Sequence, residues 1–144
     1  MPRAGLRLAR FSIMKYLTIL FTLFIVLIII LADLGQLGFL KLLNQIPFAD
    51  KIGHFVLYGI LTLLLDLTFT RALPPSSRKL TVLRIALILS LLIGLEEYSQ
   101  QFIAKRTFDL VDLAFSYLGV AFFSWLALRV RKPPTPKGSN DYRF

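Results

Sequence analysis

The chain has 144 residues, of which 56% are hydrophobic, and its 17 Lys and Arg outnumber 8 Asp and Glu to give a formal net charge of +9. A soluble domain of this length could not hide so much apolar surface, so the composition excludes a soluble globular protein and indicates one small helical membrane domain. The positive side chains stand between and beyond the apolar runs, where lipid head groups lie, which argues against nucleic-acid binding. The absence of cysteine excludes a disulfide and a thiolate site.

The chain opens with a basic segment that leads into the first apolar run. Residues 1–12 carry three arginines, and the apolar run continues to Leu31. A signal peptide starts in the same way, but its apolar core is usually shorter, and no small-x-small cleavage site follows this run. We therefore predict a basic N-terminal segment over 1–12 and an uncleaved first transmembrane helix over about 13–32.

Three more apolar segments follow along the chain. The second predicted helix, about 49–70, comes after Pro47, and its length of about 31 Å is enough to cross the hydrocarbon core. The run Pro74-Pro75-Ser76-Ser77 breaks the chain before a third helix over about 80–103. A short polar connection then leads to a fourth helix over about 110–129. The expected fold is all-α, a polytopic membrane protein with a bundle of four transmembrane helices.

The distribution of positive charge gives the expected orientation. The four helices form one domain over 13–129, and the proline-rich residues 130–144 predict a disordered tail. Residues 1–15, 71–84 and 129–144 hold 13 of the 17 Lys and Arg, and the other two connections hold four. Because basic loops stay in the cytoplasm, both termini are expected to be cytoplasmic.

The second predicted helix carries a stripe of polar side chains. Asp50, His54 and Tyr58 are four residues apart, so they lie on one face of a helix. His54 is the only histidine in the chain. A polar side chain in hydrocarbon costs free energy unless it finds a partner, so this face is expected to point at protein rather than at lipid.

Polar residues of the last three predicted helices meet at the outer membrane face. Glu97 lies about 20 Å along the third helix from Arg84, which is too deep in a ~30 Å core for a solvated end residue. We therefore expect a polar pocket that opens to the outer leaflet. Its candidate ligand-binding residues are Asp50, Lys51, His54, Tyr58, Glu97, Gln100, Arg106, Asp109, Asp112 and Ser116.

These residues form two motifs, namely Asp50-Lys51-x-x-His54-Phe55-x-x-Tyr58 and Glu97-x-x-Gln100 followed by Arg106, Asp109, Asp112 and Gly119. In order and spacing, the motifs resemble the VanZ-like family of small bacterial integral membrane proteins. The resemblance covers residues 50–59 and 94–119. One departure is Ser116, where the family pattern has Asn, because a hydroxyl lacks the paired donor and acceptor of an amide.

The resemblance implies a place in the bacterial cell envelope. The family takes its name from a member linked to resistance to glycopeptide antibiotics such as teicoplanin. A multi-pass protein of the bacterial inner membrane with both termini cytoplasmic is therefore expected. The resemblance carries over no catalytic roles.

Three functional interpretations are open. The favoured one is recognition of an anionic envelope component, either a lipid-linked precursor or a lipid head group, with Arg106 and Lys51 as the anion contacts. The first rival is an enzyme in which His54 and Glu97 act as acid and base on a lipid-linked substrate. The second is a small proton-coupled transporter that uses these two residues as a relay, with Asp66 as the sole acid of the inner half.

The same residues also have structural interpretations. His54 can be a hydrogen-bonded packing element, and Glu97 can form a buried ion pair with Arg106 that holds the third and fourth helices together. Of the two adjacent glutamates, the spacing to Gln100 and Arg106 selects Glu97 for the pocket and leaves Glu96 nearer to lipid or head groups.

Few additional ligands are expected. A single histidine does not give the paired spacing of a zinc site, and the chain has no glycine loop for phosphate, so no metal or cofactor is predicted. The expected partners are membrane lipids, a lipid-linked envelope precursor and further copies of the chain. Nucleic acid is not expected, since no basic recognition helix lies outside the apolar segments.

Overall fold

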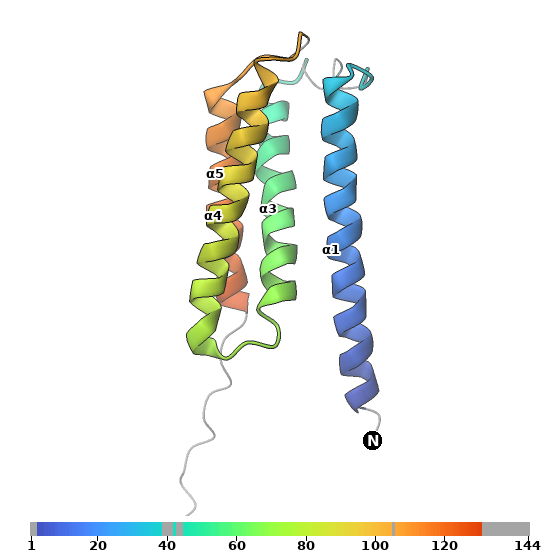
Figure 1. Ribbon diagram of the computed structural model, residues 1–144, viewed down its shortest axis with the longest axis vertical. Coiled ribbons are helices and arrows are strands. Elements are labelled where there is room, and N and C mark those ends of the chain that lie inside the picture. Colours follow the sequence, from blue (N-terminus) through green and yellow to red (C-terminus); the bar gives the residue numbers. More distant parts are fainter. Residues whose placement is uncertain (1–2, 39–41, 43–44, 105, 131–144) are drawn as a thin grey trace, which may run out of the picture.

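The computed structural model describes residues 3–38, 42, 45–104 and 106–130, and it contains four helices in this part of the chain (Figure 1). The all-α fold class is confirmed. The helices are α1 (Arg3–Asp33), α3 (Ala49–Phe69), α4 (Pro75–Gln100) and α5 (Leu110–Val130).

The helix boundaries agree with the prediction at α3 and α5 and differ at the other two. α1 begins at Arg3 rather than near residue 13, so most of the predicted basic segment continues the helix. α4 begins at Pro75, five residues early, because proline at the first helical position loses only an N–H that would have no helical partner. The predicted tail covers 130–144, of which Val130 is the last residue of α5 and the rest lies outside the described residues.

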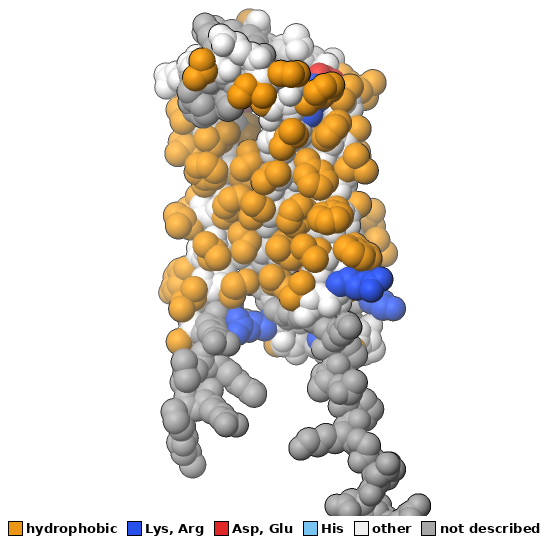
Figure 2. All heavy atoms as spheres, turned by 180° about the vertical axis from the view of Figure 1, so that it is seen from behind, with side chains coloured by type: hydrophobic (Ala, Val, Ile, Leu, Met, Phe, Trp, Pro, Cys, Tyr) orange, Lys and Arg blue, Asp and Glu red, His pale blue; other side chains and the backbone are white. Residues whose placement is uncertain are grey.

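Three helical segments are long and apolar enough to cross a membrane, judged by length and composition within the described residues. They are Ser12–Asp33, Ala49–Phe69 and Leu110–Val130. Hydrophobic side chains cover the face shown in Figure 2 along its length, with most of the visible Lys and Arg side chains toward one end. A soluble protein rarely exposes so large an apolar surface. The protein is therefore a membrane protein, whereas a spanning role for α4 stays a prediction.

α3 is the central helix of the bundle, since it packs against α1, α4 and α5. Its contact with α5 is close because of Gly119, where an added Cβ would overlap the backbone carbonyl of Phe55. Close backbone approach at small residues is typical of helix packing in membranes. α1 joins α3 partly through the hydroxyls of Thr18 and Thr68, whose Oγ1 atoms are 2.8 Å apart.

A fully buried acid lies in the half of α3 away from Asp50. Asp66 has no exposed surface, and its carboxyl group is beside the Ser124 hydroxyl of α5. Thr70, the residue that caps α3, donates from its backbone N–H to the Asp66 carbonyl oxygen at 3.0 Å. Asp66 is therefore part of the interior of the α3–α5 interface.

Candidate functional site

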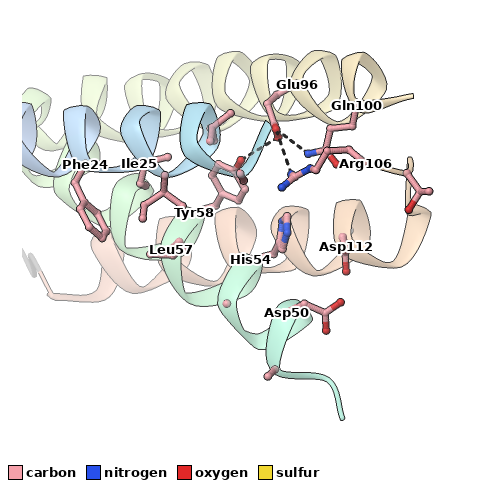
Figure 3. Close-up of a pocket in the computed structure, with 16 residues that line it drawn as sticks. Phe24, Ile25, Asp50, His54, Leu57, Tyr58, Glu96, Gln100, Arg106 and Asp112 are labelled. Carbon is pink, nitrogen blue, oxygen red and sulfur yellow. Dashed lines mark hydrogen bonds and ion pairs between the residues drawn. The ribbon is translucent and has the colours of Figure 1, made fainter. Parts of the chain in front are cut away.

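A cavity of about 470 Å³ lies where α1, α3 and α4 approach the α4–α5 connection (Figure 3). One part of its wall is apolar and the other is polar. The apolar part comes mainly from α1 and includes Phe24, Ile25, Ile28, Ile29 and Leu57 of α3. The polar part consists of Asp50, His54, Tyr58, Glu96, Gln100, Arg106, Thr107 and Asp112.

The polar stripe predicted for α3 faces this cavity. Asp50, His54 and Tyr58 all line it, as the spacing of four residues predicted. Tyr58 is buried and donates from its hydroxyl to Oε2 of Glu96 at 3.2 Å. The stripe therefore meets protein across the cavity rather than lipid.

Glu96 is the central acceptor of the cavity and was assigned to the wrong environment by the sequence analysis. Its Oε1 accepts a hydrogen bond from Nε2 of Gln100 at 2.7 Å, in addition to the bond from Tyr58. The same oxygen is 4.0 Å from Nη2 of Arg106. Glu96 and Gln100 are one helical turn apart, but Glu97 and Gln101 have the same i,i+4 spacing, so spacing alone could not select Glu96.

Glu97 has a structural position instead. It is 1% exposed, and its Oε1 accepts the backbone N–H of Asp109 at 3.0 Å. The predicted Glu97–Arg106 ion pair is wrong, because Arg106 pairs with Glu96 and with Asp33. Adjacent residues are about 100° apart around a helix, so only one of the two glutamates can face the cavity. Glu97 holds the start of α5 against the end of α4.

Arg106 also contacts α1, through an acid that the sequence analysis did not select. Its Nε is 3.7 Å from Oδ1 of Asp33, the last residue of α1. Both ion pairs of Arg106 are long, and within the described residues its guanidinium makes no hydrogen bond at ordinary distance. A guanidinium has five N–H donors, so Arg106 keeps donors for a ligand in the cavity.

Lys51 is surrounded by carboxylates, which changes its expected role. Its Nζ is 3.1 Å from Asp50, 3.3 Å from Asp109 and 2.9 Å from Asp112, and its side chain is 16% exposed. The ammonium has three N–H donors and three carboxylate partners within 3.3 Å, so it keeps no donor for a ligand. Lys51 therefore joins α3 to α5 and is a poor candidate for the anion contact.

Asp109 lies just before α5 and begins that helix. Its Oδ1 accepts the backbone N–H of Val111 at 2.7 Å, as in an N-terminal cap. This hydrogen bond, with a smaller contribution from Lys51, holds the pKa of Asp109 below its usual value. The carboxylate form is thus stabilised by the folded structure.

The hydrogen bonds of Ser116 determine the tautomer of neutral His54. Ser116 is fully buried, and its hydroxyl donates to the Asp112 carbonyl oxygen at 2.9 Å. The hydroxyl has one proton, so toward His54 Nδ1, 3.2 Å away, it can only accept. Nδ1 therefore carries the proton, and Nε2 of neutral His54 is the acceptor. The serine at this position supplies the acceptor that an amide oxygen would supply.

Two sequence-based hypotheses, the acid–base pair and the proton relay of His54 and Glu97, stay predictions. Glu97 does not line the cavity, although it lies close enough to His54 for an electrostatic interaction. Asp66 does not line it either. Glu96 and Arg106 face His54 across the cavity (Figure 3).

Comparisons with family models, with curated proteins and with solved structures gave no match. The resemblance to the VanZ-like family therefore stays a prediction based on motifs. The chemistry of the cavity is the remaining guide to function.

Proposed function

We propose that this protein is a VanZ-like membrane protein of the bacterial envelope that binds the anionic head group of a lipid or a lipid-linked precursor in the cavity beside Arg106. One observation carries the proposal. The Arg106 guanidinium lines the cavity with two long ion pairs and no hydrogen bond within the described residues. A phosphate or carboxylate can take up its N–H donors in a bidentate contact.

The mixed lining of the cavity supports a lipid rather than a small soluble anion. One part of the wall is polar, and the other is formed by Phe24, Ile25 and neighbouring apolar residues. A ligand with a charged head and an apolar tail complements both parts. The acceptors at His54 Nε2 and Glu96 suit a head group that also carries a hydroxyl or an ammonium.

The proposed orientation places the cavity at the outer face of the inner membrane and both termini in the cytoplasm. It is supported by the excess of Lys and Arg in the three segments assigned to the cytoplasm. The α4–α5 connection beside the cavity lies at the end of the bundle away from the N-terminus (Figure 1).

The orientation is tested with single cysteines, which the chain otherwise lacks. Thr107→Cys should react with an impermeant thiol reagent added to intact cells, and Ser77→Cys should react only after the cells are opened. The reverse pattern would place the cavity in the cytoplasm and contradict the proposed envelope function.

Ligand binding is tested through Arg106→Gln. The purified protein is analysed for co-purifying lipids by mass spectrometry, with Arg129→Gln as the control. Arg129 is a suitable control because it is exposed and its guanidinium lies 5.1 Å from the ring centroid of Trp125, away from the cavity lining. We expect Arg106→Gln to lose an anionic lipid that the wild type and the control retain. Equal lipid content in all three proteins would refute the head-group site.

A further inference from the structure

A second cavity of about 580 Å³ continues the first along α1, α3 and α4. The two cavities share four lining residues, Ile25 and Ile29 of α1, Tyr58 of α3 and Glu96 of α4. The two cavities therefore adjoin, with these four residues between a polar end and an apolar groove.

Apolar side chains line almost all of the groove between its ends. Its lining includes Leu61, Leu65, Ile85, Leu89, Leu92 and Ile93. The Thr22 hydroxyl in its wall already donates to the Thr18 carbonyl oxygen at 2.8 Å. Water in such a space would find few hydrogen-bond partners. An apolar chain forms no hydrogen bonds and enters the groove without that cost.

The groove runs along most of the length of α4. It extends from Glu96 at the polar end to Thr81. Fifteen residues of helix correspond to about 22 Å, most of a hydrocarbon core ~30 Å thick. A chain that starts from a head group beside Glu96 can therefore lie along the groove.

We propose that this groove holds a hydrocarbon chain of the same lipid whose head group binds beside Arg106. The inference rests on the proposed function and makes it more specific. The ligand is a membrane lipid bound by its head and by one chain, and the protein recognises both. A head group alone, detached from its chain, would bind more weakly because the groove would then stay unfilled.

The test compares two neighbouring substitutions on α4. Leu92 lines the groove and Leu91 does not, although both are more than half exposed, so a larger side chain has room at either position. Leu92→Trp fills the groove one turn from Glu96, and Leu91→Trp adds the same bulk on another side of the helix. The probes are long-chain and short-chain phosphatidylglycerol, and native mass spectrometry in detergent measures their binding.

We expect the wild type and Leu91→Trp to bind the long-chain lipid about ten-fold more tightly than the short-chain lipid. Leu92→Trp should lose this preference and still bind the short-chain lipid as the wild type does. Partition of the probes into micelles is the same for both variants, so it cannot produce the difference.

The outcomes separate the two proposals. If the wild type binds both lipids without a chain-length preference, the groove does not hold a hydrocarbon chain, and the proposed head-group site stays intact. A dimer that Leu92→Trp dissociates would assign the groove to a second copy of the chain instead. Absence of binding of either lipid to the wild type, with no other anionic lipid retained, would overturn both proposals.

Discussion

The close backbone contact between α3 and α5 makes Gly119→Ala an informative stability test. An added Cβ would overlap the carbonyl oxygen of Phe55 and would lie 3.1 Å from its carbonyl carbon and 3.2 Å from its Cα. All three atoms belong to the backbone of α3, so no side chain can rotate away. The substitution must instead push α5 away from α3 along their interface.

The expected loss follows from two opposing contributions. Overpacking of this kind costs roughly 1–3 kcal/mol and sometimes more. Replacing glycine by alanine within a helix returns up to about 1 kcal/mol. At Gly53, in contrast, an added Cβ meets nothing within 4 Å, so Gly53→Ala should only gain stability. The two variants should therefore differ by roughly 1–3 kcal/mol in their free energy of unfolding.

The measurement is reversible unfolding of the purified protein in mixed micelles, with increasing denaturing detergent. The wild type, Gly119→Ala and Gly53→Ala are compared under one condition. Equal midpoints for the two alanine variants would show that α3 and α5 do not approach one another as described.

Substitutions at three further positions test the polar contacts. Lys51→Met removes the shared cation and should cost about 2 kcal/mol near neutral pH, between the usual values for exposed and buried pairs. The pKa of Asp109 in the folded protein lies below 3.8, the value for the free side chain. The Asp109 carboxylate therefore contributes to the free energy of unfolding above that pH, and this stabilisation is lost as the pH falls through the folded pKa. The stability gap should therefore narrow in acid, and a constant gap in denaturation curves would contradict the assigned pairing. Glu97→Ala should cost roughly 1–3 kcal/mol by leaving the Asp109 N–H unpaired, whereas Glu97→Gln keeps an acceptor and should cost less in the same assay. Nitrogen NMR of the single His54 should show the Nδ1–H tautomer of the neutral ring, and Ser116→Ala should remove that preference; an unchanged spectrum would refute the hydrogen-bond assignment.

The helices could largely be predicted from the sequence, because long apolar runs have few other possible structures. The error at α4 arose because Pro75 was interpreted as a breaker, although proline also occupies first helical positions without cost. The sequence pattern around a proline does not distinguish a helix breaker from a first helical residue, whereas the folded structure does.

The candidate site could be predicted only in part. The stripe on α3 follows from spacing alone, since Asp50, His54 and Tyr58 share one face in any regular helix. The choice between Glu96 and Glu97 depends on the rotation of α4. The residues before them are apolar on every side, so periodicity gives no information about that rotation. The contact between Arg106 and Asp33 joins residues of distant segments and has no signal in local spacing.

The buried position of Asp66 has a consequence for synthesis of the protein. A carboxyl group costs about 2.5–3.5 kcal/mol at the centre of a spanning helix during insertion, and less at Asp66, which lies three residues before the end of α3. The Ser124 hydroxyl beside this carboxyl group belongs to α5, which ends about 60 residues after α3. At 5–20 residues per second, the ribosome needs roughly 3–12 s to make that stretch. During this interval α3 lacks its main partner, so a nascent chain truncated before α5 should be retained by the insertion machinery or degraded.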